Sequence, residues 1–264
     1  MSSLSPEQIK AATRQAWEKS ADGWNRQTPQ IHAWLAPATV AMLDSARRVG
    51  PGGSVLAPDI SAAILQFAQE NAQRAGLANV EIRVGDAEAL SVEAASFDAV
   101  VCRLGLMFCP EPLLALRQAY RALKPGGHIA VLVFSEPQHN PCIGILMSTA
   151  LQHAGLPPRD PFQPGSLLSL GKPGLLDALF REAGFSEVTT SRLDAPFRLP
   201  SAEDYLSFVR TSASPIMQLL GQLDAVAQAA AWAAMKDKLQ AFQSPIGWAG
   251  PNELLLTHGA RPAQ

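Results

Sequence analysis

The chain has 264 residues, of which 47% are hydrophobic and 17% are charged. A chain of this length and composition can bury a core, so intrinsic disorder is excluded as the starting hypothesis. The formal net charge is −2, and no stretch is basic enough to neutralise a run of phosphates, so we expect no nucleic-acid partner.

The hydrophobic runs are short, and the N-terminal segment has no signal-peptide pattern. The longest clean run, residues 129–134, is too short to cross a bilayer, and residues 1–10 are polar. We therefore expect a soluble, cytoplasmic protein with no membrane partner. The cysteines Cys102, Cys109 and Cys142 are odd in number and widely spaced, which predicts reduced thiols rather than a disulfide framework or a metal site.

The N-terminal part of the chain predicts helices. Ser5 can cap a helix that begins at Pro6 and runs to about Trp17, because serine accepts from free backbone amides and proline suits the first turn. A short-helix region with Trp24 and Trp34 follows, and then a helix over residues 38–49. The Gly-Pro-Gly-Gly run at residues 50–53 ends that helix.

Strands and helices alternate from residue 54 onward. We predict strands at residues 54–57, 80–84, 97–102 and 128–134, and helices at 61–75 and 112–123. Strands separated by helices of this length imply parallel crossovers, and nearly continuous apolar strands imply a sheet covered on both faces. The sequence therefore predicts an α/β fold with a mostly parallel sheet containing these four strands, and no strand before residue 54.

The C-terminal half is more irregular. Residues 137–172 are rich in proline and glycine, carry one helix at about 143–154, and are interpreted as an insertion over the binding edge of the sheet rather than a second domain. Beyond them we predict a helix at 173–183, a strand at 188–193, a helical region at 203–242 and a strand at 252–257. The last two strands should pair at one edge of the sheet.

Two aspartates follow strands at the positions where parallel α/β sheets bind ligands. Asp59 can accept from both hydroxyls of a ribose, or it can support the helix that starts near Ser61. Asp86 can accept from an adenine amino group, or it can serve only as a turn residue. Because the two aspartates lie one strand-helix unit apart, a nucleotide site with both carboxylates facing one cleft is the stronger hypothesis.

Other candidate motifs are weaker. The glycine runs at residues 50–53 and 124–127 each follow a helix and precede a strand, whereas a dinucleotide fingerprint needs the reverse order, so a nicotinamide dehydrogenase is the least favoured enzyme class. His32 and His139 lie in segments that could reach a pocket, and either could be a general base or only a surface histidine. No catalytic residue and no metal site is assigned.

Four short segments resemble the class I S-adenosylmethionine-dependent methyltransferases related to the ubiquinone and menaquinone biosynthesis enzymes. They are V-L-A-P-D-I-S at 55–61, V-G-D-A-E at 84–88, S-F-D-A-V at 96–100 and L-K-P-G-G at 123–127, and their order and spacing match over residues 46–135. The resemblance implies a Rossmann-like methyltransferase fold with S-adenosylmethionine as cofactor. The activity it implies is methyl transfer to a small, hydrophobic molecule.

The resemblance also implies roles for individual residues. Asp59 would hold the cofactor ribose and Ile60 would flank the adenine. Asp86 and Ala87 would contact the adenine edge, and Arg103 would line the methionine end. The chain would then be one methyltransferase-like domain, residues 1–264. Its parts are N-terminal helices (1–53), a cofactor-half core (54–135), a substrate-side insertion (136–172), and C-terminal helices with edge strands (173–264).

The chain departs from this family in two ways. Family members carry a central strand and a D-x-G-x-G loop before the Asp59 strand, and about 20 to 30 residues of that kind are absent here. Pro58 also stands where a small polar residue is expected. The Asp59 strand must then pair directly with the strand at 97–102 or leave a poorly satisfied seam.

The absent loop has a functional consequence, because glycines let the backbone approach the cofactor closely. We therefore expect weak cofactor binding. Two alternatives follow, a non-catalytic binding or scaffold protein that has lost cofactor capture, and a defective reading frame.

Overall fold

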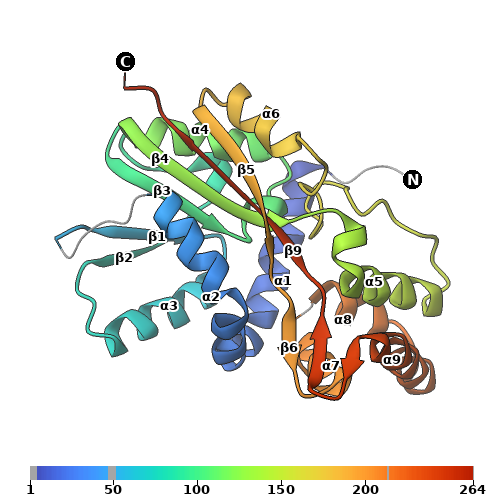
Figure 1. The fold of residues 1–264 in the computed structure, drawn as a ribbon. Coiled ribbons are helices and arrows are strands. Elements are labelled where there is room, and N and C mark those ends of the chain that lie inside the picture. Colours follow the sequence, from blue (N-terminus) through green and yellow to red (C-terminus); the bar gives the residue numbers. More distant parts are fainter. Residues whose placement is uncertain (1–4, 47–51, 213, 264) are drawn as a thin grey trace.

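The computed structural model describes residues 5–46, 52–212 and 214–263, and it begins with two long helices (Figure 1). These are α1 (Pro6–Arg26) and α2 (Thr28–Ser45), which together cover the two predicted helices and the tryptophan-bearing region between them. A reciprocal cap starts α1: Gln8 N donates to Ser5 Oγ over 3.3 Å and Ser5 N donates to Gln8 Oε1 over 2.8 Å. The end of the helix predicted over 38–49 lies outside the described residues.

The first strand-helix-strand unit forms a small parallel sheet. It consists of β1 (Val55–Asp59), α3 (Ala62–Arg74) and β2 (Val80–Val84), and β1 pairs with β2 in parallel. Ser61 caps α3, since its Oγ accepts from Ile64 N at 3.2 Å. The predicted order and type of these elements are therefore confirmed.

A second, mixed sheet has the order β3-β4-β9-β5. Its strands are β3 (Phe97–Arg103), β4 (Leu123–Phe134), β5 (Ser186–Asp194) and β9 (Glu253–Ala260), and α4 (Pro112–Ala122) connects β3 to β4. β3 and β4 are parallel, and β9 is antiparallel to both β4 and β5. The predicted antiparallel pair is thus confirmed, with β5 at the edge and β9 inside the sheet.

The prediction of one parallel sheet containing the strands at 54, 80, 97 and 128 is wrong for the described residues. β1 pairs only with β2, and β3 pairs only with β4. Residues 5–46 and 52–54 contain no strand, so none of the residues described there supplies a strand to join the pairs. We call the space between the unpaired strands β1 and β3 the seam. Val55 of β1 and Val101 of β3 are 40% and 45% exposed. At one end of the seam an open hollow of about 520 Å³ is lined by residues of β1 and β2 and by Ser96 and Phe97.

The backbone of β1 indicates which side of the strand is open. Val55 N donates to Asn79 O and Gly85 N donates to Asp59 O, both over 2.9 Å. Because backbone groups alternate along a parallel ladder, Leu56 and Pro58 direct theirs away from β2, toward the seam. A proline has no amide there to donate to a further strand. Pro58 therefore suits β1 as an edge strand.

The C-terminal helices enclose a second hydrophobic cluster. The region predicted as helical over 203–242 forms α7 (Ala202–Ser212), α8 (Ser214–Leu220) and α9 (Ala225–Leu239), and the short helix η4 (Gln240–Phe242) follows. A three-stranded sheet that the sequence did not predict lies beside them, with β6 (Phe197–Leu199), β8 (Gly247–Gly250) and β7 (Gln243–Ser244) in that order. Trp248 of β8, only 1% exposed, sits in this cluster.

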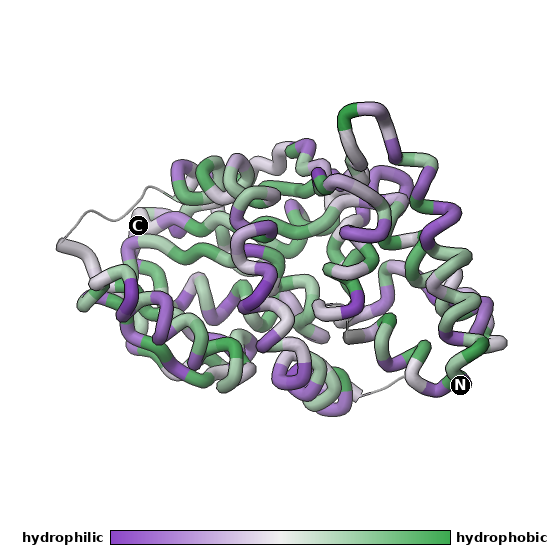
Figure 2. Tube along the Cα trace, turned by 90° about the horizontal axis from the view of Figure 1, so that it is seen from below, coloured by the Kyte–Doolittle hydropathy of each residue, from purple (hydrophilic) through white to green (hydrophobic). Residues whose placement is uncertain are grey.

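The segment between β4 and β5 contributes to both clusters. It contains η3 (Pro137–His139), α5 (Pro141–His153) and α6 (Leu175–Glu182). The buried residues Leu146 and Ala150 of α5 belong to the second cluster, whereas Leu168 and Leu170 pack with the main sheet. The peripheral helices alternate hydrophobic and hydrophilic residues along their length (Figure 2). None of the helices described is both long and apolar enough to cross a membrane.

Candidate functional site

Asp59 lies at the carboxyl end of β1, as predicted. Its Oδ1 accepts from the backbone amide of Ser61 at 2.8 Å, so it does support the start of α3. Burial raises the pKa of the Asp59 carboxyl, although the amides of Ser61 and Ile60 oppose that effect, and the nearby carboxylate of Glu18 raises it further. This half-buried acid at a strand end is therefore in an environment unlike that of an ordinary surface cap.

Asp86 lies at the corresponding end of β2 and uses both of its carboxylate oxygens. Oδ1 accepts from Glu88 N at 2.9 Å, which starts the short helix η1 (Ala87–Ala89). Oδ2 lies 2.7 Å from Nζ of Lys10 in α1. The turn role left open by the sequence is thus present, and a lysine holds the second oxygen.

Glu88 contacts both α1 and the residue that precedes α4. Its side chain is 1% exposed, its Oε1 accepts from Glu111 N at 2.7 Å, and its Oε2 lies 2.6 Å from Lys10 Nζ. Burial lowers the pKa of Lys10, but the hydrogen bonds to Asp86 and Glu88 outweigh burial, so its pKa is raised overall. Lys10 is accordingly a charged bridge between two carboxylates.

The other predicted cofactor residues lie nearby in the chain but differ in exposure. Ile60 is half-buried between Asp59 and Ser61, and Ala87 is exposed in η1. Arg103 is exposed at the end of β3, and its guanidinium donates to Thr39 Oγ1 of α2 over 3.1 Å. The next residue, Leu104, has a φ of 55°, which is a strained conformation for a leucine at a strand end.

Two cysteines indicate where the aspartates lie relative to β3. Burial raises the pKa of Cys102, and the charge of Asp59 adds to this. Burial also raises the pKa of Cys109, and Cys102, Glu88 and Asp86 contribute. Asp59 thus lies near Cys102 of β3, and Asp86 lies near Cys109 in the segment that follows β3. Whether the two carboxylates face one cleft stays a prediction.

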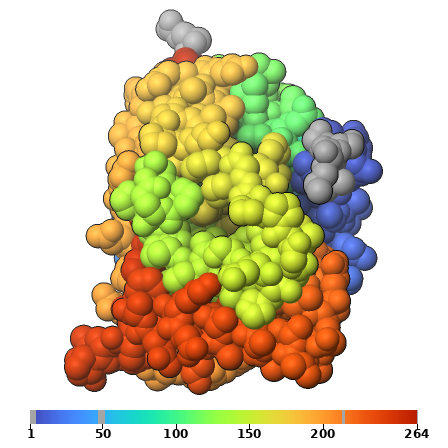
Figure 3. Space-filling view, turned by 90° about the vertical axis from the view of Figure 1, so that its right-hand side faces the viewer, coloured from blue at the N-terminus to red at the C-terminus, as the bar shows by residue number. Residues whose placement is uncertain are grey.

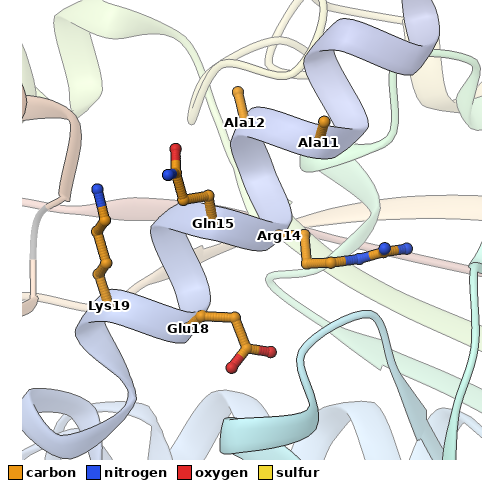
Figure 4. Close-up of a pocket in the computed structure, with 6 residues that line it drawn as sticks. All are labelled: Ala11, Ala12, Arg14, Gln15, Glu18 and Lys19. Carbon is orange, nitrogen blue, oxygen red and sulfur yellow. The ribbon is translucent and has the colours of Figure 1, made fainter.

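Sequence reasoning missed three residues of this region: Lys10, Glu18 and Glu88. Glu18 Oε1 accepts from Ala63 N at 3.4 Å, at the start of α3. Figure 4 shows Glu18 and Arg14 directed to one side of α1 and Lys19 directed to the other. These residues of α1 line an open hollow of about 790 Å³. Only Glu88 had a sequence signal, since it lies within the V-G-D-A-E segment.

The two candidate histidines differ in exposure. His32 is exposed on α2, and His139 is half-buried in η3. In the part of the chain that the structure describes, no group of three or more histidine, cysteine, aspartate or glutamate side chains is arranged to hold a metal ion.

Comparison with known proteins connects these strands to one family. Residues 35–131 match the methyltransferase domain family. The demethylmenaquinone methyltransferase of Lactococcus lactis is 36% identical over 94 residues, which are 36% of this chain and 37% of that protein. The ubiquinone/menaquinone biosynthesis C-methyltransferase of Escherichia fergusonii is 40% identical over 92 residues, 34% of this chain and 37% of that protein. The chain thus matches little more than a third of the length of these relatives.

Solved structures resemble the chain over a longer stretch. The YcgJ protein of Bacillus subtilis superposes with a TM-score of 0.51 at 17% identity, over 79% of this chain and 82% of that one. Phosphoethanolamine N-methyltransferase 2 of Haemonchus contortus, solved with S-adenosylhomocysteine, gives 0.51 at 16% identity, over 86% of this chain and 53% of that one. At such identities the likeness concerns the fold alone, and it confirms the predicted Rossmann-like α/β fold.

Proposed function

We propose that this chain, which belongs to the class I S-adenosylmethionine-dependent methyltransferases through residues 35–131, transfers a methyl group to a small, hydrophobic molecule. The observation that carries the proposal is the position of Asp59 and Asp86, each at the carboxyl end of a parallel strand inside the matched stretch. A parallel α/β sheet binds its ligand at that edge.

The residues of the chain would mainly bind and orient. Asp59 would accept from the ribose hydroxyls and Ile60 would flank the adenine. Asp86 and Ala87 would contact the adenine edge, and Arg103 would line the methionine end. S-adenosylmethionine supplies the electrophilic methyl group when it is bound. Alignment of the acceptor and exclusion of water would then supply a large part of the rate, and no residue is assigned as the base that takes the proton lost by the acceptor.

The segment between β4 and β5 is our candidate for the acceptor side. Residues 136–172 form the yellow-green surface between the N-terminal helix and the C-terminal helices (Figure 3). The relatives named above are C-methyltransferases of quinone biosynthesis or act on demethylmenaquinone by name. We therefore propose a hydrophobic acceptor and would first assay demethylmenaquinone-type aromatic compounds.

A second function is supported by the seam and by Lys10. Within the described ranges no strand is followed by a loop with two or more glycines, and Lys10 already holds one oxygen of Asp86. A binding or scaffold protein that has lost cofactor capture would have these features. Calorimetric titration with S-adenosylmethionine and S-adenosylhomocysteine separates the two functions: saturable heat supports the methyltransferase, and no heat at millimolar ligand supports the scaffold.

The ribose role of Asp59 gives a direct prediction. Asp59→Ala should weaken S-adenosylhomocysteine binding about 5- to 150-fold, the factor that corresponds to losing a charged hydrogen-bond partner worth about 1–3 kcal/mol. Calorimetry or fluorescence titration measures it. Asp160→Ala is the matched control, because Asp160 Oδ1 accepts from Phe162 N at 2.9 Å in the same local geometry on an exposed turn. Equal affinities for the Asp59 variant and the parent would remove Asp59 from the cofactor site.

A further inference from the structure

Leu104, the residue that follows β3, has a backbone conformation that ordinarily favours glycine. Its φ of 55° lies in the left-handed region, where the Cβ of any other residue comes too close to a neighbouring carbonyl oxygen. Among the described residues, Ala95 and Glu187 are the only others that combine a side chain with a positive φ, and both are exposed. Leu104 is half-buried, so it alone of the three has an enclosed side chain.

The neighbouring glycine does not take this conformation. Gly105 has a φ of −112°, an ordinary negative value. It lacks a side chain for another reason, since a Cβ at this position would lie 3.1 Å from Cys102 Sγ. The turn thus has its glycine where space is short and keeps a leucine where glycine would relieve the backbone. Strain retained in this way collects at sites where the side chain is used.

Leu104 lies where the strand of the cofactor half meets the proposed acceptor side. Leu104 N donates to Leu132 O over 2.9 Å, which continues the pairing of β3 with β4 past the end of β3. Three residues further on, Met107 O accepts over 2.6 Å from the hydroxyl of Ser169, in the segment between β4 and β5. The residue before it, Arg103, is the one proposed to line the methionine end. Leu104 therefore lies between the two proposed ligand regions.

We propose that Leu104 determines acceptor specificity: its side chain is the apolar surface on which an aromatic acceptor lies beside the transferred methyl group, an inference that rests on the proposed function. A leucine packs on a ring through its methyl groups and offers no hydrogen bond to a polar acceptor. The bonds from Leu104 N to β4 and from Phe108 N to Gly105 O, 3.0 Å long, fix the turn on both sides. A fixed surface of this kind aligns the ring for attack.

Binding of 1-naphthol, a two-ring aromatic probe, tests the contact by fluorescence titration. Leu104→Ala should weaken it about 5- to 10-fold, because much of the apolar surface is removed, and should change S-adenosylhomocysteine affinity less than about twofold. Leu104→Met, which keeps the apolar volume, should bind 1-naphthol like the parent. Leu179→Ala is the matched control, because Leu179 is a half-buried leucine of α6 that packs against the same main cluster.

Stability tests whether the backbone at residue 104 is strained. Leu104→Gly and Leu104→Ala remove the same apolar surface, but only glycine relieves the left-handed conformation. The glycine variant should therefore unfold at a higher denaturant concentration than the alanine variant, while both bind 1-naphthol equally weakly. Ala95→Gly is the control for strain alone, because Ala95 has a φ of 52° and is exposed. Its unfolding midpoint should rise with no change in binding.

Each outcome decides the role of Leu104. Unchanged 1-naphthol affinity in Leu104→Ala, or a loss that Leu179→Ala shares, would overturn it. So would a glycine variant no more stable than the alanine variant, since the leucine would then not be retained against the backbone. If the parent binds S-adenosylhomocysteine but not 1-naphthol, the acceptor surface is wrong and the cofactor site stands. If the parent binds neither, the proposed function fails and the role of Leu104 with it.

Discussion

S-adenosylhomocysteine should bind this chain about two to four orders of magnitude more weakly than it binds a relative that has the complete glycine loop. In such relatives the loop after the central strand offers backbone amides to the carboxylate end of the cofactor. Losing two or three hydrogen bonds to a charged group, each worth roughly 1.5–2 kcal/mol, costs about 3–6 kcal/mol. Asp59 and Asp86 would still hold the adenosine end. The dissociation constants of both proteins, measured by calorimetry, check this.

A graft tests the cause of the weak binding. A strand and a D-x-G-x-G loop from a related enzyme are inserted between Leu43 and Ala46, and cofactor affinity is compared with that of the parent. The control insert has the same length, with its loop glycines replaced by alanine, so that backbone approach is blocked and chain length is kept. Micromolar affinity in the parent, with no gain in the graft, would show that the chain binds its cofactor by other means.

Pro58 affects how well such a graft can work. An inserted strand would lie in the seam, where its backbone carbonyls would accept hydrogen bonds from amides of β1. Pro58 lies on that edge of β1 and has no amide to donate. The graft should therefore gain more affinity when Pro58 is also replaced by serine. The same substitution without the graft should leave affinity unchanged, because no strand among the described residues pairs with that edge.

Local patterns were sufficient for most elements of the fold. Apolar runs bounded by glycine and proline predicted β1, β2, β3 and β4 to within a few residues, although β4 begins earlier, at Leu123. The short strands β6 and β7, of three and two residues, carry too little sequence pattern to be recognised. The sequence left open whether β1 pairs with β3 or a seam remains between them, because that pairing depends on contacts distant in the sequence; the structure has the seam.

The candidate site was likewise predicted from the sequence only in part. Asp59 and Asp86 were found because ligands bind at the ends of parallel strands, and each does lie at such an end. Lys10 was missed because a lysine on an amphipathic helix is usually solvated, and its partner Asp86 is 76 residues away in the chain. Only the folded arrangement shows that one cation joins α1 to two carboxylates.

Trp248→Ala should lower the free energy of unfolding by about 3–5 kcal/mol, the usual cost of truncating a fully buried tryptophan. The side chain is 1% exposed, it stacks on Tyr205 with ring centroids 4.7 Å apart, and its Nε1 donates to Leu239 O over 2.8 Å. Truncation would leave a cavity in the second cluster and one unsatisfied carbonyl. Denaturant unfolding followed by circular dichroism measures the change.

Trp232→Ala is the matched control, because Trp232 is only half-buried on α9 and lies under Arg210, 4.7 Å from the guanidinium carbon to the ring centroid. Its loss should cost no more than about 1 kcal/mol. The same experiment tests the proposal that residues 1–264 form one domain, since a single domain unfolds in one transition by every probe. If Trp248→Ala melts the C-terminal helices while the sheet around β4 keeps its parent stability, the helices are an independent unit and the single-domain proposal is wrong.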